Sequence, residues 1–93
     1  MIRAFADRDT EKVWRRLPVK RWGRDVQRAA YRKLLIIDAV DTAADLAVPP
    51  GNRLEKLAGD RAGQYSVRVN DQWRICFNWR NGNADDVEIT DYH

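Results

Sequence analysis

The residues best suited to proton chemistry lie at the end of the chain. His93 is the one histidine in the sequence, and the ordinary imidazole pKa of about 6.5 lets it give or take a proton at neutral pH. Asp91 could orient that ring or take a proton, and Tyr92 could stack on a base or donate a hydrogen bond to a phosphate. The alternative is a strand-end carboxylate, an edge aromatic ring and an incidental last residue. The three residues form a candidate catalytic tail.

Arginines form a second candidate group. Arg74 follows Trp73 in a segment of alternating apolar residues, so the two side chains are predicted to point to opposite faces of a strand. Arg68 shares the face of Arg74. Because guanidinium groups match phosphate geometry, this face could grip an RNA backbone. A solvated sheet face also needs arginines, and Arg68 could simply pair with Glu88 across the sheet.

The elements that position these residues are predicted from apolar periodicity. Residues alternate over 64–69 and 73–79, a last strand is predicted over 86–91, and turns are predicted at 70–72 and 80–84. The apolar face should pack under helices. It collects Tyr65, Val67, Val69, Trp73, Ile75, Phe77, Trp79, Val87 and Ile89. The opposite face collects polar side chains, including the three arginines of these strands, together with Cys76.

The first half of the chain predicts one short strand and two helices. A strand is expected over 2–6, followed by a helix that Pro18 ends and that buries Val13, Trp14 and Leu17. A second helix is expected from Trp22 to Ala47, before Pro49 and Pro50. Its apolar stripe is Val26, Ala30, Leu34, Ile37, Val40, Ala44 and Ala47. The predicted fold is α+β in the order β-α-α-β-β-β, a single domain over 1–93 with two helices packed on a mainly antiparallel sheet.

The outer face of the long helix is basic. It carries Arg24, Arg28, Arg32 and Lys33, which could dock on RNA phosphates, hold a protein partner or keep the chain in solution. Residues 1–36 hold 11 basic and 4 acidic side chains, a net of +7, whereas residues 37–93 hold 6 basic and 10 acidic, a net of −4. The total is the +3 of the whole chain. A basic half of this kind suits nucleic acid or an acidic protein surface.

Composition excludes several classes of protein. Hydrophobic residues make up 44% of the 93 residues and charged residues 33%, which is typical of a globular domain rather than a disordered chain. One cysteine and one histidine exclude an internal disulfide and argue against a structural zinc site, so no metal or cofactor is expected. A charged N-terminus and the lack of a long apolar run predict neither a signal peptide nor a membrane span, and hence a cytoplasmic location.

Three segments resemble the HigB-type toxins of the RelE/ParE superfamily. They are PPGNRLEKL at 49–57, GDRAGQYSVRVNDQWRICFNW at 59–79 and VEITDYH at 87–93. The resemblance implies an endoribonuclease that depends on the ribosome and cuts mRNA in the decoding site. It also implies a HigA-type antitoxin that carries a helix-turn-helix, neutralises the toxin and represses the shared operon, so that operator DNA is bound only through the complex.

Cleavage of this kind requires a 2′-hydroxyl to attack the adjacent 3′-phosphate, with a base, a cationic stabiliser and an acid. The resemblance implies that His93 belongs to the catalytic tail and that Arg74 is the catalytic arginine, with Asp91 and Tyr92 beside them. Arg68, Arg53 and Lys56 are further candidates for RNA binding.

Glu55 departs from the family pattern, because some HigB-type toxins place a histidine there. A glutamate could act as the general base but could not bring positive charge to phosphate. Alternatively, Glu55 is a surface loop residue paired with Lys56 or Arg53.

Two other functions remain open at this stage. ParE-type relatives share the fold but poison DNA gyrase by contact, and fold alone does not choose between the two activities. A weakened toxin that mainly binds its antitoxin is the third possibility, because of Glu55. The terminal Asp-Tyr-His sequence favours the ribonuclease.

Overall fold

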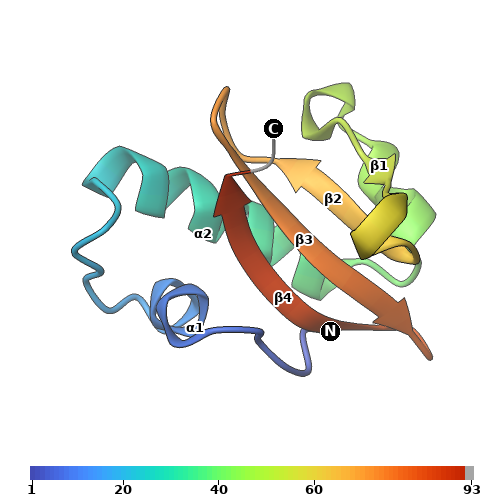
Figure 1. Cartoon of the computed structure of the whole chain (residues 1–93), viewed down its shortest axis with the longest axis horizontal. Helices are drawn as coiled ribbons and strands as arrows, with labels where there is room; N and C mark the ends of the chain where they lie inside the picture. The colour runs from blue at the N-terminus through green and yellow to red at the C-terminus, as the bar shows by residue number, and fades with distance from the viewer. Residues whose placement is uncertain (92–93) are drawn as a thin grey trace.

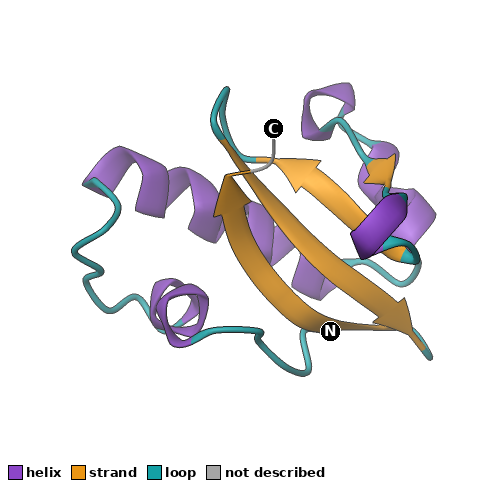
Figure 2. Cartoon of the chain, viewed as in Figure 1, coloured by secondary structure: helices purple, strands orange, loops and turns teal. Residues whose placement is uncertain are grey.

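In the computed structural model, which describes residues 1–91, two helices pack with a four-stranded antiparallel sheet, one across a face of the sheet and the other beside its last strand (Figure 1). The strands are β1 (Glu55–Lys56), β2 (Gln64–Arg68), β3 (Trp73–Arg80) and β4 (Asn83–Asp91), in the spatial order β1-β2-β3-β4. The helices are α1 (Arg8–Trp14) and α2 (Arg24–Ala39). Three 3₁₀ turns, η1 (Ala43–Ala47), η2 (Pro50–Asn52) and η3 (Gly59–Arg61), gather at the β1 edge (Figure 2). The predicted α+β class is confirmed.

Both predicted turns join neighbouring strands. Asn81 and Gly82 connect β3 to β4 with φ angles of 52° and 79°, a conformation that asparagine and glycine tolerate better than other residues. In the connection from β2 to β3, the Asn70 side-chain oxygen accepts hydrogen bonds from the backbone N–H of Gln72 (2.9 Å) and Trp73 (2.8 Å). Such local side-chain bonds explain why asparagine favours turns.

The core lies between α2 and the apolar face of the sheet. Ala30, Leu34 and Ile37 of α2 are fully buried. They belong to one cluster with the predicted strand residues, of which Val67, Ile75, Phe77, Val87 and Ile89 are at most 1% exposed. The alternation of apolar residues therefore assigns this face of the sheet correctly.

The first helix is shorter than predicted. It ends at Trp14, and the chain turns at Arg16, whose φ is 62°. Leu17 is consequently 48% exposed instead of lying on the buried face of the helix. At the other end of α1, the Asp7 carboxylate caps the helix by accepting the backbone N–H of Thr10 at 2.7 Å.

The long predicted helix is also wrong beyond Ala39. Val40 is extended, and Thr42 and Asp45 form a reciprocal capping box that starts η1. The break moves the apolar stripe by one residue, so that Ala43 and Leu46 are buried while Ala44 and Ala47 are exposed. Trp22 precedes α2 and packs edge-on against Trp73 at 5.7 Å between ring centroids.

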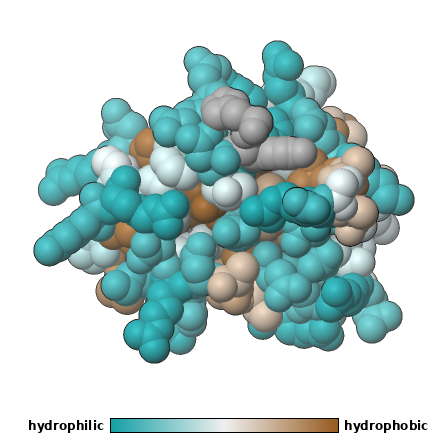
Figure 3. All heavy atoms as spheres, viewed as in Figure 1, coloured by the Kyte–Doolittle hydropathy of each residue, from teal (hydrophilic) through white to brown (hydrophobic). Residues whose placement is uncertain are grey.

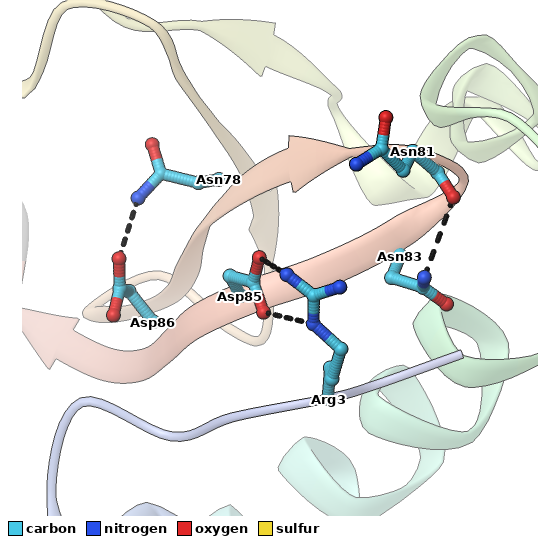
Figure 4. A network of polar contacts seen from close by, with 6 residues as sticks. All are labelled: Arg3, Asn78, Asn81, Asn83, Asp85 and Asp86. Carbon is cyan, nitrogen blue, oxygen red and sulfur yellow. Dashed lines mark hydrogen bonds and ion pairs between the residues drawn. The ribbon is translucent and has the colours of Figure 1, made fainter.

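The predicted opening strand is reduced to two isolated parallel bridges, Ile2 with Ala84 and Phe5 with Val87. Arg3 reinforces them through two hydrogen bonds to the buried Asp85 carboxylate, at 2.8 and 3.1 Å (Figure 4). This segment covers the edge of β4, which would otherwise expose unpaired backbone groups. Beside it, β4 bulges at Asp86, which has a φ of 53° and accepts a hydrogen bond from Asn78 at 2.9 Å.

The Thr10 hydroxyl ties α1 to β4, since it accepts the buried backbone N–H of Ile89 at 3.0 Å. Replacing Thr10 by valine keeps the shape but leaves that N–H without an acceptor, which costs about 1–3 kcal/mol. We expect urea denaturation to show this loss for Thr10→Val and a smaller one for Thr10→Ser, which keeps the hydroxyl. A valine variant as stable as the wild type would contradict the role of this bond.

Candidate functional site

The candidate site lies on the sheet face turned away from α2, which is mostly hydrophilic (Figure 3). Strand pairing places Glu55, Ser66, Cys76 and Glu88 in one row across the four strands. The next row contains Arg68, Arg74 and Thr90. The predicted facing of Arg74 is confirmed, because Trp73 packs against the core on the other side.

The Arg74 guanidinium is held in place by neutral acceptors. Its Nε donates to Ser66 Oγ at 2.9 Å, and its Nη2 donates to the carbonyl oxygens of Arg53 (2.6 Å) and Ser66 (3.4 Å). The Glu55 carboxylate is farther away, at 3.9 Å from Nη2. Only 13% of the Arg74 side chain is exposed. The group therefore has a fixed position, set by three neutral acceptors, with the exposed Glu55 carboxylate at the limit of ion-pairing distance.

Arg74 lines an open cavity of about 550 Å³ beside the β2–β3 turn. Three arginines and two carboxylates line it, namely Arg53, Arg68, Arg74, Glu55 and Asp71, together with Asn70 and Gln72. The structure thus brings four of the predicted site residues together. A concave surface with an excess of guanidinium groups can bind phosphate oxygens.

Glu55 is a strand residue, not a loop residue, because β1 pairs it with Ser66 of β2. A carboxylate oxygen of Glu55 faces Arg74, and 58% of the Glu55 side chain is exposed. Neither predicted partner, Lys56 or Arg53, forms an ion pair with it within residues 1–91. Lys56 follows Glu55 in the strand and lies opposite Tyr65, so the pleat directs it to the other face, away from the cavity.

Arg68 does not pair with Glu88 as predicted. It forms an ion pair with Asp71, three residues later in the turn. Glu88 instead pairs with Arg61 of η3 at 3.1 Å. The Arg61 guanidinium also donates to Gln64 Oε1 at 3.0 Å, so it lies across the sheet and covers part of the polar face.

We expected Ser66 and Cys76 on a solvated face, but both are fully buried. Arg61 lies near Cys76, and the Arg74 guanidinium contacts Ser66. Sequence reasoning missed Ser66 as a site residue because its contact with Arg74 runs from one strand to the neighbouring strand. Burial raises the pKa of the Cys76 thiol above its ordinary value, and the nearby carboxylates of Glu88 and Glu55 raise it further, against the opposing effect of Arg61 and Arg74.

Asp91 lies at the end of β4, beside the same turn. It pairs with Trp73 across the sheet, and its carboxylate accepts a hydrogen bond from Gln72 Nε2 at 3.2 Å. Because Asp91 lies opposite Trp73, the pleat directs its side chain to the sheet face away from Arg74. Its bond to Gln72, which lines the cavity, connects it to the rim of the site. Tyr92 and His93 lie outside the described residues.

The basic residues predicted on α2 are not part of this cavity. Arg24, Arg28 and Arg32 are exposed on the helix that covers the other face of the sheet. Lys33 is not on a free outer face, because its ammonium group donates to the side-chain oxygen of buried Asn52 at 2.6 Å. The apolar stripe of α2 therefore does not predict which of its basic side chains are exposed and which form contacts within the protein.

Residues 1–91 contain no group of three or more histidine, cysteine or acidic side chains placed to hold a metal ion. Within the same residues, no helix is both long enough and apolar enough to cross a bilayer.

Comparison with known families decides the relationship. The family model described as the RelE-like toxin of the type II toxin–antitoxin system HigB matches residues 3–93. The chain belongs to this HigB-like toxin family. The Toxin HigB-1 of Vibrio cholerae is 48% identical over 59 residues, and the Endoribonuclease HigB of Proteus vulgaris is 37% identical over 59 residues. The matches cover 63% and 61% of this chain, which spans 62% and 64% of the length of these relatives.

Solved structures support the RelE-like fold of this HigB-like toxin. A heterotetrameric YoeB–YefM toxin–antitoxin complex from Staphylococcus aureus contains a chain that superposes with a TM-score of 0.63 at 16% identity, covering 100% of this chain and 98% of that one. A second YoeB–YefM complex from the same organism gives a TM-score of 0.60 with the same coverage and identity. At this identity the likeness concerns the fold alone.

The raised pKa of the buried Cys76 thiol should make the free energy of unfolding of this HigB-like toxin depend on pH. Its raised pKa means that the unfolded thiol ionises first, so its contribution is complete below an ordinary thiol pKa of about 8.5 and is lost as the pH rises further. Between pH 7.5 and 9.5, urea denaturation should show a steeper fall in the free energy of unfolding for the wild type than for Cys76→Ala. The excess should reach at most about 1.4 kcal/mol per pH unit. Equal slopes would contradict the assignment.

Proposed function

We propose that residues 1–93 act as a single toxin domain that cuts mRNA on the ribosome and so inhibits translation. The observation that carries the proposal is the Arg74 guanidinium, fixed by Ser66 and Arg53 on the wall of a concave surface, with Glu55 beside it. The name of one relative, Endoribonuclease HigB, supports the same chemistry. The proposed partner is a HigA-type antitoxin with a helix-turn-helix, which neutralises the toxin and connects it to operator DNA.

In the proposed reaction, the 2′-oxygen of one nucleotide attacks its own 3′-phosphorus, and the bond from phosphorus to the 5′-oxygen of the next nucleotide breaks. Glu55 takes the proton of the 2′-hydroxyl, and His93 gives a proton to the departing 5′-oxygen. The products are a 2′,3′-cyclic phosphate and a free 5′-hydroxyl. Asp91 and Tyr92 support His93 in this scheme.

Arg74 is proposed to stabilise the charge that develops on the phosphoryl oxygens. Among residues 1–91, its hydrogen bonds use Nε and Nη2, which leaves Nη1 for a phosphoryl oxygen. The neutral acceptors orient the group, and a group that is already oriented loses little energy to reorganisation during reaction. Arg53 and Arg68, which line the same cavity, are proposed to bind the flanking phosphates.

The test is primer extension on a defined mRNA, with and without programmed ribosomes. We expect cuts that require ribosomes, and a loss of about 10²–10³ in cleavage rate for Arg74→Ala, the range for removing one donor to a developing oxyanion. His93→Ala should also lose cleavage. Arg80→Ala removes an exposed arginine of β3 that does not line the cavity, and it should cut like the wild type.

Two outcomes would contradict the proposal in different ways. Cleavage by Arg74→Ala at the rate of Arg80→Ala would remove Arg74 from the mechanism but keep the nuclease. Growth arrest in cells without any cleavage by the wild type would contradict the nuclease itself and favour inhibition of gyrase by contact.

A further inference from the structure

A second concave surface, of about 410 Å³, lies where the end of α1 meets the start of α2. We call it the α1–α2 groove and define it by Arg16, Leu17, Pro18, Arg24, Arg28 and Tyr31. None of these residues lines the cavity around Arg74. The groove lies between the two helices, whereas the Arg74 side chain lies on the sheet face opposite to the core.

Local contacts build the groove before any partner binds. The Arg16 N–H donates to the carbonyl of Val13 at 3.0 Å, and the Leu17 N–H donates to that of Lys12 at 2.8 Å. These two bonds hold Arg16 at a φ of 62° and leave Leu17 48% exposed beside Pro18. An exposed leucine next to proline gives the groove an apolar contact point.

The charge of the groove has one sign. The eight residues that line it include three arginines, at positions 16, 24 and 28, and no carboxylate. Asp25 reaches Arg28 only at 3.9 Å and has a fully exposed side chain, so it screens that charge weakly. An occupant should therefore present carboxylates or phosphates around an apolar group.

The aromatic ring of the groove distinguishes a peptide from a nucleic acid. Tyr31 contacts Trp14, with 6.0 Å between ring centroids, and the Arg16 guanidinium lies 4.9 Å from the Tyr31 centroid. A base needs an open aromatic face for stacking, and these neighbours occupy the surroundings of the ring. The exposed Leu17 side chain is apolar and forms no favourable contact with a charged phosphate backbone. Both observations favour a polypeptide.

We propose that the α1–α2 groove binds a segment of the antitoxin that places an apolar side chain against Leu17 and carboxylates against Arg24 and Arg28. This inference rests on the antitoxin partnership proposed above. It assigns the partner's chemistry: an acidic segment with an apolar anchor.

The test is the affinity of the full chain for the helix-turn-helix protein encoded beside it, measured by isothermal titration in the Arg74→Ala background to avoid toxicity. Arg24→Glu combined with Arg28→Glu should weaken binding at least tenfold and flatten its dependence on salt. Leu17→Ser should weaken binding about fivefold. Arg32→Glu combined with Arg80→Glu is the matched control, because it also reverses two exposed charges, both outside the groove, and it should bind within twofold of its parent.

The possible outcomes distinguish an error in the docking site from an error in the proposed antitoxin partnership. Equal affinities for the groove double reversal and for the control double reversal would overturn the groove as the docking site while leaving the partnership intact. No binding by the parent chain would contradict the partnership and, with it, the occupant assigned here. With Arg74 restored, ribosome-dependent cleavage lost in the groove double reversal while antitoxin affinity is kept would show that the groove binds RNA instead.

Discussion

The guanidinium of Arg74 needs hydrogen-bond acceptors because it lies on the sheet with 13% of its side chain exposed. A charged group so far removed from water is costly unless its hydrogen bonds are made. Ser66 supplies two acceptors from the neighbouring strand, and the Arg53 carbonyl supplies a third from the connection that precedes β1. Arg53 adopts a φ of 46° there. The need to satisfy one arginine thus attaches residues 53–56 to the sheet and places Glu55 in the site.

The same physical rule organises the rest of the connection between α2 and β2. Asn52 is buried and donates to the carbonyls of Leu46 and Val48 at 3.2 and 3.3 Å, while it accepts a hydrogen bond from Lys33. Arg61 likewise attaches the connection to the sheet, because it donates hydrogen bonds to Gln64 and Glu88. Polar anchors therefore hold a long connection against the sheet, so the cavity has a defined wall rather than a mobile loop.

Sequence reasoning succeeds where the signal is local. Alternation over two strands predicts the facing of Arg74 from that of Trp73, and the asparagine–glycine pair predicts the β3–β4 turn. It fails where a distant contact decides the outcome. The contact between Arg61 and Glu88 spans 27 residues, and no periodic pattern predicts it. The break after Ala39 has a local signal, because the residue types of the Thr42 and Asp45 capping box can be recognised in the sequence. The apolar residues after Ala39 nevertheless keep helical spacing, and this spacing favours a continuous helix.

We propose that Ser66 contributes to cleavage through Arg74, and a double-mutant cycle tests this role most directly. Single-turnover cleavage on programmed ribosomes would be measured for the wild type, Ser66→Ala, Arg74→Ala and the double variant. Loss of the Ser66 hydroxyl should slow the wild type at least tenfold, because a hydrogen bond to a charged group contributes about 1.5–3 kcal/mol. It should change the rate of Arg74→Ala less than twofold. An equal tenfold loss in both backgrounds would show that Ser66 acts independently of Arg74 and would contradict the account.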